Sequence, residues 1–422
     1  MKRSAICLAL LLAACGEKAT MPLQTGADPT LPNPATTLIP TVKIAPAKGW
    51  PEGTTPKAAA GGTVTPFAAG LEHPRWVYVL PNGDVLVAET AAPKRPEEGK
   101  GFKAKAMGMA MKKAGSAVPS ANRITLLRDA DGDGIAETRS PFLEGLNSPF
   151  GMDLVGDDLY VANTDSVMRF KYTPGAMRID APGEKIADLP GGPRNHHWTK
   201  NLIASPDGTK LYVTVGSNSN VAEHGMDAEN GRAAIWEVDL QKKSHRVFAT
   251  GLRNPNGLAW EGGRLWTVVN ERDELGSDLV PDYLTSVADG GFYGWPYSYY
   301  GQNVDKRVEP QRPDLVGKAI KPDYALGSHV APLGLAMTKE GAYIGQHGSW
   351  NRRPPSGYNV VFVPFKDRKP SGAPVEVLNG FLSPQGEAWG RPVGVAVDSK
   401  GGVLVADDVG NTVWRVTGIS PR

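Results

Sequence analysis

The stretch HPRWVYVLPNGDVLVA, residues 73–88, sets the pattern of the whole chain. A Pro-containing start leads into an apolar run, a tight turn with Gly follows, and a second apolar run completes the unit. Two apolar runs joined by a short Gly-containing turn indicate a β-hairpin. The same phrase returns five more times, over residues 147–162, 197–214, 253–268, 329–345 and 390–406.

The spacing of these six copies indicates how they assemble. They begin roughly 50–75 residues apart, which is enough chain for a four-stranded unit in each interval. Such a unit cannot bury both of its faces alone, and radial closure of repeated sheets removes their exposed edges. The sequence therefore predicts an all-β, six-bladed β-propeller over residues 61–422. The turns before the first strand of each blade should gather around one axial pit.

Composition and motifs exclude several functional classes. The 422 residues carry 46 Lys and Arg against 44 Asp and Glu, so the net charge of +2 gives no indication of nucleic-acid binding. The chain has no glycine-rich dinucleotide fingerprint, no Walker phosphate loop and no Gly-x-Ser-x-Gly elbow. Nicotinamide dinucleotides, nucleoside triphosphates and serine hydrolysis are therefore disfavoured.

The N-terminus has the features of an export signal. Met1-Lys2-Arg3 precedes an apolar run that ends in Leu-Ala-Ala-Cys at Cys15, which resembles a bacterial lipobox. We predict a lipoprotein signal peptide over 1–15, lipidation of Cys15, and an exported lipoprotein anchored to a periplasm-facing membrane. The alternative is an ordinary signal peptide that contains Cys. Residues 16–60 are rich in Pro, Thr and Ala, and we predict a flexible tether there.

A basic segment interrupts the first blade over residues 91–121. It holds seven basic and two acidic residues, a net charge of +5, together with Met107, Met109 and Met111. One interpretation is a solvated, partly mobile loop. The other is a docking surface for an acidic electron-accepting partner or for anionic lipid headgroups.

The predicted pit is lined by the residues that precede each inner strand. Four of the seven histidines fall there, and such clustering on one face indicates a functional site more strongly than one isolated His does. The candidates are His73, Arg75, Asn147, Phe150, His196, His197, Arg253, Asn254, His329, Trp389 and Arg391.

The pair His196-His197 has two interpretations. Adjacent residues on an extended segment point in opposite directions, so both rarely reach one metal ion. We favour a single neutral imidazole acting as a general base. Arg253-Asn254 supplies a permanent cation and an amide, a pair that suits an oxyanion or a quinone oxygen.

The stretch DADGDG over residues 129–134 is similar to a calcium loop. Asp129, Asp131 and Asp133 alternate around Gly132, as a hard cation with oxygen ligands requires. Position twelve is Ser140 rather than Glu, which departs from the EF-hand. A structural calcium site and a plain polar hairpin turn both remain open.

Several phrases in the propeller region, residues 71–416, resemble one known family. They are HWTKNL with PDG (197–208), GLRNPNGL (251–258), NERDELG (270–276), GFYGWP (291–296) and RPV (391–393). Together they resemble the soluble quinoprotein glucose/sorbosone dehydrogenases, and within them the L-sorbosone branch. The resemblance implies a six-bladed propeller that holds pyrroloquinoline quinone (PQQ) and calcium in its pit and oxidises an aldose or related sugar aldehyde. It also implies an electron acceptor such as a periplasmic cytochrome or a quinone.

The resemblance assigns roles to individual residues. His197 matches the base, and the backbone carbonyls of Asp273 and Glu274 fall where the family coordinates its calcium. The residues matched to the cofactor are Arg253 and Asn254 on the quinone oxygens and Arg391 on a carboxylate, with His196 and Asn147 beside them.

Three positions depart from the family pattern. His196 stands where an acid is found, Trp389 stands where a second arginine is found, and residues 345–352 offer no blade-five lysine. A non-catalytic sugar-binding propeller with a decayed cofactor site therefore stays an alternative. A calcium-dependent sugar lactonase is a second alternative. It needs several carboxylates around one ion, and the axial turns are richer in His and Arg than in acids.

Overall fold

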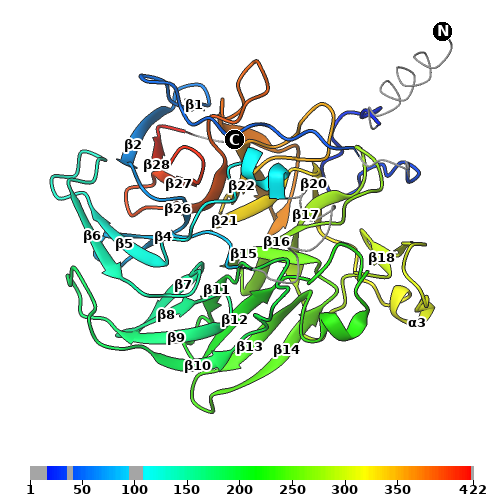
Figure 1. The fold of residues 1–422 in the computed structure, drawn as a ribbon, viewed down its shortest axis with the longest axis horizontal. Helices are drawn as coiled ribbons and strands as arrows, with labels where there is room; N and C mark the ends of the chain where they lie inside the picture. Colours follow the sequence, from blue (N-terminus) through cyan, green and yellow to red (C-terminus); the bar gives the residue numbers. More distant parts are fainter. Residues whose placement is uncertain (1–16, 36–40, 95–107, 420–422) are drawn as a thin grey trace, which may run out of the picture.

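The computed structural model describes residues 17–35, 41–94 and 108–419, so the expected signal peptide and Cys15 lie outside the described residues. Six antiparallel sheets surround one axis, which confirms the predicted six-bladed propeller (Figure 1). Five of them have four strands, and the sheet of blade five has two short strands in addition to its four. The first three blades are β3 (Pro74–Val79), β4 (Val85–Glu89), β5 (Arg123–Arg128), β6 (Thr138–Leu143); β7 (Met152–Val155), β8 (Asp158–Ala162), β9 (Ser166–Lys171), β10 (Glu184–Asp188); and β11 (Leu202–Ala204), β12 (Lys210–Val215), β13 (Ala234–Asp239), β14 (Ser244–Thr250).

The other three blades follow the same order from the axis outward. They are β15 (Asn254–Glu261), β16 (Arg264–Asn270), β17 (Pro281–Val287), β20 (Tyr324–Ser328); β21 (Pro332–Thr338), β22 (Gly341–Gln346), β23 (Asn359–Lys366), β25 (Val375–Asn379); and β26 (Pro392–Val397), β27 (Val403–Asp407), β28 (Thr412–Thr417), β2 (Thr63–Ala69). Smaller elements are β1 (Lys57–Ala58), β18 (Ser298–Tyr299), β19 (Asn303–Val304), β24 (Lys369–Pro370), the 3-10 helix Met226–Glu229 and α3 (Pro313–Val316).

The ring closes by pairing the two ends of the chain. Blade six takes three strands from the C-terminal region and its outer strand, β2, from the N-terminal region. The register runs from Thr63 opposite Thr417 to Ala69 opposite Thr412. This pairing satisfies the outer edge of β28, which would otherwise be left as an open sheet edge.

Glycine within the repeated Pro-x-Gly phrase lets the inner strands meet at the axis. A Cβ built on any of these glycines would lie 2.2–2.9 Å from backbone atoms of the next blade, closer than real contacts allow. The close approaches are Gly151 to Leu202, Gly257 to Leu335, Gly334 to Val393 and Gly394 to Arg75. The phrase that identifies the repeat therefore also sets the distance between blades.

We expect Gly334→Ala to destabilise the propeller. The new methyl group would meet the Val393 carbonyl oxygen at 2.2 Å, and such overpacking costs about 1–3 kcal/mol. Chemical denaturation should show this loss in the free energy of unfolding. Gly108→Ala is the matched control, because a Cβ there meets nothing within 4 Å. Equal stability of the two variants would contradict this account of the axis.

Residues 17–35 and 41–60, here named the arm, are packed on the propeller, which differs from the predicted tether. The backbone of Gly26 pairs with Ala325, and the Lys43 amide donates to the Trp350 carbonyl at 2.7 Å. The Trp50 indole donates to Asp407 at 2.7 Å, and its ring contacts Phe381, Trp389 and Trp414. The composition argument failed because backbone hydrogen bonds and a few apolar anchors suffice to hold this segment.

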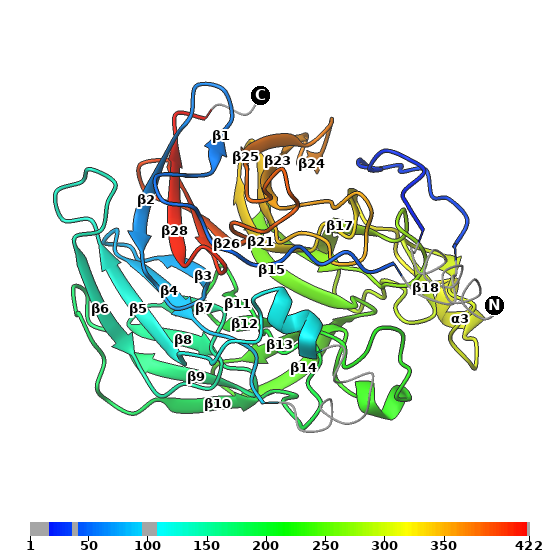
Figure 2. The same cartoon turned by 45° about the horizontal axis from the view of Figure 1, so that its top comes forward.

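The basic insert contributes a short helix, residues 108–113, on the face where the inner strands begin. We call this the pit face. The helix and the arm both cross it (Figures 1 and 2), and the Ala47 amide donates to the Lys113 carbonyl at 2.9 Å. Residues 95–107 lie outside the described part of the chain. Within the described ranges, no helix has the length and apolar character needed to cross a bilayer.

Candidate functional site

A cavity of about 340 Å³ opens at the axis on the pit face, within the usual size range of small-molecule sites. Five of the seven histidines of the chain line it. Its polar lining residues are His73, Ser116, His196, His197, Arg253, Asn254, Asn270, Glu271, Asp273, Asp282, His329, His347, Asn351, Arg391 and Asp408. Ile44 of the arm, Ala110 and Met111 of the insert, and Trp350 add apolar surface.

The structure brings together most of the residues that the repeat predicted, but not all. Arg75, Asn147, Phe150 and Trp389 do not line the cavity. Asn147 is bonded to Asp165 on the exposed rim of blade two, at 2.7 Å, so the prediction that it lines the pit is wrong. Phe150 is fully buried in the core, and Trp389 packs against Trp50. Other neighbours hold these side chains, although their backbone positions match those of the lining residues.

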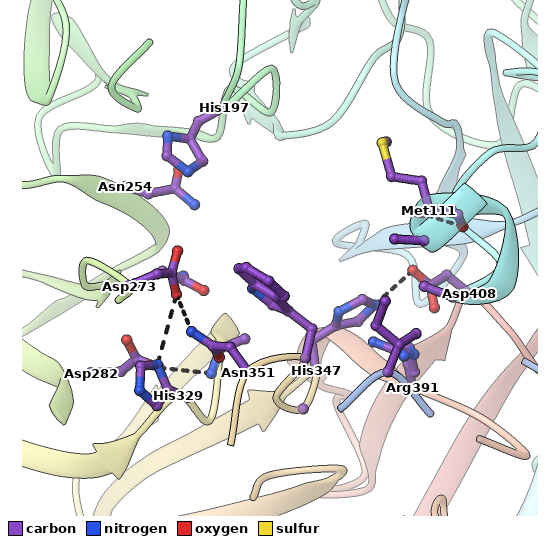
Figure 3. Close-up of a pocket in the computed structure, with 18 of the residues that line it drawn as sticks. Met111, His197, Asn254, Asp273, Asp282, His329, His347, Asn351, Arg391 and Asp408 are labelled. Carbon is purple, nitrogen blue, oxygen red and sulfur yellow. Dashed lines mark hydrogen bonds and ion pairs between the residues drawn. The ribbon is translucent and has the colours of Figure 1, made fainter. Parts of the chain in front are cut away.

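His197 is held with one ring nitrogen free. Its Nδ1 lies 2.8 Å from the Ser217 carbonyl oxygen, which can only accept, so Nδ1 carries the proton and Nε2 keeps its lone pair. Burial, then the Arg253 and His196 charges, lower the pKa of His197 well below its usual value. The imidazole is therefore neutral at neutral pH. Figure 3 shows it at the cavity beside Asn254, as a proton acceptor would need to be.

Hydrogen bonds from Lys200 hold the segment that carries His197. The buried Lys200 amine donates to the carbonyls of His197 and Trp198, both at 3.2 Å. Burial, then the Arg232 charge, lower the pKa of Lys200 well below its usual range. Gly216 leaves the space that the side chains of Asn254 and His197 need. A Cβ at this position would lie 2.5 Å from Asn254 Oδ1 and 2.6 Å from His197 Cβ.

Arg253 is a rigid cation in the same wall. Its guanidinium donates to the Glu271 carbonyl at 2.7 Å, to both oxygens of Asn220, and to Asp273 Oδ2 at 3.1 Å. Asn220 also accepts from the Asp273 amide at 2.9 Å. Four of the five N–H groups of Arg253 are thus used by the protein, and one remains for a ligand.

The predicted calcium ligands do not have the expected geometry. The Asp273 carbonyl accepts from Asn220 Nδ2 at 3.3 Å and from Arg307 at 2.9 Å, and Glu274 does not line the cavity. It is the side chain of Asp273 that faces the cavity, where it accepts from Asn351 at 2.6 Å and lies 3.7 Å from His329 (Figure 3). Asp273 therefore lines the cavity through its carboxylate rather than through the backbone carbonyl that was expected to bind calcium.

The opposite wall holds a buried carboxylate that sequence reasoning missed. Asp408 accepts from Arg75 at 2.6 Å and from His347 Nε2 at 2.9 Å, and His73 Nε2 lies 3.7 Å away (Figure 3). Burial lowers the pKa of His347 to about 4, so this imidazole is neutral and donates its Nε2 proton to Asp408. Asp408 and His347 follow second strands, β27 and β22, whereas the prediction considered only the turns before first strands.

His347 should make the protein less stable in acid. In the unfolded chain His347 gains a proton near its ordinary pKa of 6.5, whereas in the folded protein its pKa is about 4. The free energy of unfolding therefore falls as the pH drops from 6.5 to 4, by up to about 3 kcal/mol from this group. The His347→Gln variant should lose less stability over this pH range, so the free energies of unfolding of the wild type and the variant should converge in acid. Urea unfolding at several pH values tests this, and parallel pH profiles would contradict it.

The cavity contains more acid than the repeat predicted. Glu271, Asp273, Asp282 and Asp408 all line it, although the lining is still richer in His and Arg than in acids. The described residues nevertheless offer no cluster of three acidic or imidazole ligands there that could share a metal ion. Asp273 and Asp408 are paired with cations, and burial raises the pKa of Asp282 to about 8. The arrangement still disfavours a lactonase site.

The DADGDG loop lies between β5 and β6, on the face opposite the pit. Carboxylate oxygens of Asp129, Asp131, Asp133 and also Glu137 lie within 4.8 Å of one another. The Lys400 ammonium lies 3.7 Å from Asp129, and several backbone amides of the loop donate to these carboxylates. A cation here would therefore be remote from the cavity.

The fold and the site define a six-bladed propeller with a polar axial cavity for a small molecule. The chain belongs to the TrAA12-like family, whose match covers residues 120–283 and 314–418. It is 23% identical over 355 residues to the pyrroloquinoline quinone-dependent pyranose dehydrogenase of Coprinopsis cinerea. That alignment covers 72% of this chain, and the chain spans only 44% of the relative.

Solved structures show the same fold. The PQQ domain of the Coprinopsis cinerea pyranose dehydrogenase superposes with a TM-score of 0.70 at 21% identity, covering 89% of this chain and all of that one. A Trichoderma reesei enzyme of carbohydrate-active family AA12 gives 0.71 at 19% identity, with 90% and 99% coverage. The aldose sugar dehydrogenase of Streptomyces coelicolor gives 0.54 at 16% identity. The relatives thus include sugar oxidoreductases, and the assignment to the L-sorbosone branch stays a prediction.

Proposed function

We propose that this protein is a PQQ-dependent dehydrogenase that oxidises an aldose or a related sugar aldehyde. The observation that carries the proposal is a neutral His197 whose free Nε2 faces a cavity shared with Arg253, Asn254 and Arg391. Family membership and the names of the relatives support the same reaction class. Within that class, the motifs resembling the L-sorbosone branch favour a substrate with a free or hydrated aldehyde.

The residues present fit the cofactor, a planar quinone with three carboxylates. Arg391 is nearly fully buried, yet its Nε has no hydrogen-bond partner among the described residues, and only one weak bond, to the Ala45 carbonyl at 3.3 Å, occupies its terminal nitrogens. Asn254 Oδ1 is likewise buried without a partner. Such groups are costly unless a ligand completes them. Arg391 would hold a carboxylate, and Arg253 with Asn254 would lie at the quinone oxygens.

The protein's own part in the reaction is to position and to move a proton. The bound cofactor supplies the hydride-accepting chemistry. His197 Nε2 accepts the proton of the substrate hydroxyl, while its Nδ1–H keeps donating to the Ser217 carbonyl oxygen. Arg253, fixed by Asn220 and Asp273, stabilises negative charge that develops beside it. Ile44, Met111 and Trp350 restrict water at the reacting atoms.

Reconstitution tests the proposal. The purified protein is titrated with PQQ and Ca²⁺, the absorbance of the cofactor is followed, and dye-coupled oxidation is measured with a panel of aldoses and sugar aldehydes. We expect saturable binding at micromolar levels and sugar-dependent dye reduction. Binding without turnover would favour a non-catalytic sugar-binding propeller. No binding with Ca²⁺ present would rule out the dehydrogenase assignment.

Of the two predicted calcium sites, we propose the one in the DADGDG loop, because the described residues of the cavity offer no group of ligands that could share an ion. If the loop holds Ca²⁺, the ion should raise the melting temperature of the protein, and chelation should reverse the effect. Asp131→Asn with Asp133→Asn should remove that response while sugar oxidation with added quinone persists, since the loop lies on the far face. An unchanged melting response in the double variant would exclude the loop.

The cellular setting is also part of the proposal. The Leu-Ala-Ala-Cys signal supports lipidation at Cys15 and a membrane-anchored lipoprotein that faces the periplasm. Its electron acceptor would be a periplasmic cytochrome or a quinone. Lipidation predicts a chain that begins at Cys15 with the mass of added acyl chains, and mass spectrometry measures this.

A further inference from the structure

We propose that the pit face lies against an anionic lipid bilayer and binds it through the arm and the insert helix. The contact surface comprises Lys18, Val42, Lys43, Met109, Lys112 and Lys113, and we call it the arm–helix surface. The inference rests on the lipidation of Cys15 proposed above. It goes beyond anchoring, because it fixes which side of the propeller meets the membrane.

The path of the arm gives the first argument. The Glu17 carbonyl accepts from Thr41 Oγ at 3.0 Å and from Ser277 Oγ at 2.8 Å, and Thr20 is bonded to Asp278. The loop after β16 that holds these partners lies on the pit face, beside His329 of the cavity, whose Nε2 bonds to the Gly276 carbonyl. The chain therefore enters the described structure at the pit face.

The length of chain outside the described part gives the second argument. Two residue steps separate Glu17 from Cys15, and one step spans at most about 3.6 Å, so the two Cα atoms are no more than about 7 Å apart. A flexible tether of 45 residues would let the propeller turn freely above the membrane. Because the arm is packed on the propeller, that freedom is absent, and a lipid on Cys15 enters the bilayer next to the pit face.

The chemistry of the surface fits this place. Met109 is 67% exposed and Val42 is 43% exposed, although both are apolar. Lys43, Lys112 and Lys113 are exposed, and within the described part of the chain no ion pair joins them to a carboxylate. Met109, Lys112 and Lys113 are spaced i, i+3 and i+4 on the helix, so they share its outer side. Apolar side chains flanked by lysines are typical of interfacial binding.

The inner side of the same helix lines the cavity through Ala110 and Met111 (Figure 3). The insert therefore has one side toward the active cavity and one toward the bilayer. Of the two interpretations made from the sequence, a mobile loop or a docking surface, this favours the docking surface for anionic lipid headgroups and places it beside the cavity. We favour lipid over an acidic protein because an anchored chain has headgroups beside this surface at all times.

The test is lysine labelling of the lipidated protein reconstituted in vesicles. A membrane-impermeant amine reagent is applied in phosphatidylcholine vesicles with and without phosphatidylglycerol, and each lysine is read by mass spectrometry. We expect Lys43, Lys112 and Lys113 to react at least about fivefold more slowly with phosphatidylglycerol present, from roughly fivefold in affinity per lysine near an anionic surface. Lys339, Lys366 and Lys369, in or beside the turns at the far ends of the blade-five strands, should be unaffected.

Charge reversal provides the matched comparison. Lys43→Glu with Lys112→Glu and Lys113→Glu should abolish the protection, whereas the same reversal at 339, 366 and 369 should not. Both variants should keep dye-coupled oxidation in detergent, because none of these residues lines the cavity. Equal labelling of both faces, or protection that requires added periplasmic protein, would overturn the proposal. A chain without lipid at Cys15 would overturn it too. Quinone binding and sugar oxidation test the proposed dehydrogenase activity independently of this result.

Discussion

Replacing His197 with alanine is expected to lower turnover by about 10²–10⁴-fold while quinone binding persists. The reason is that Nε2 of His197 is free to accept the substrate proton, with Nδ1 held by the Ser217 carbonyl. Dye-coupled oxidation at saturating quinone measures the turnover, and the absorbance titration measures the binding. Because the pKa of His197 lies well below its usual value, turnover of the wild type should not decline as the pH falls through 6.5.

His196→Ala is the matched control for His197→Ala. The two rings pack edge to face with centroids 4.7 Å apart, so both substitutions empty similar space at the cavity. We expect the His196 variant to be milder. Equal losses in the two variants, or near-normal turnover of His197→Ala, would show that the proton acceptor lies elsewhere, and His347 on the opposite wall would be the next candidate.

Arg391→Ala is expected to weaken quinone binding by about 10- to 100-fold, from a charge-assisted contact worth about 1.5–3 kcal/mol. The expectation follows from the incompletely bonded guanidinium of Arg391, which the protein stacks on Tyr358 at 5.1 Å and leaves open to the cavity. Quinone affinity is read from the absorbance titration. At saturating quinone, turnover should largely recover.

Arg253 should behave differently. Four of its five N–H groups are bonded within the protein, so its removal also releases Asn220 and Asp273. We expect Arg253→Ala to lower turnover even at saturating quinone, and Arg253→Lys to restore only part of it, because Lys lacks the planar fork. If the two arginine variants lose affinity and turnover in the same proportion, the separate roles are wrong.

The site could be predicted in part because its residues follow a repeat. His73, His196, His197, Arg253, Asn254, His329 and Arg391 stand before inner strands, and ring closure brings those positions to one axis. The same logic misplaced Asn147 and Trp389, since a shared backbone position does not fix where a side chain points. Neighbouring side chains decide the direction, because Asp165 binds Asn147 and Trp50 packs on Trp389.

The sequence by itself determined the six blades, because alternating apolar strands and Gly-containing turns are local signals that need no partner to be recognised. Only the tertiary structure decided that Asp408 is hydrogen-bonded to His347, that Met111 faces the cavity, and that the arm is packed on the pit face. Those contacts join segments far apart in the chain through backbone hydrogen bonds and single side chains, which leave no periodic pattern to be read.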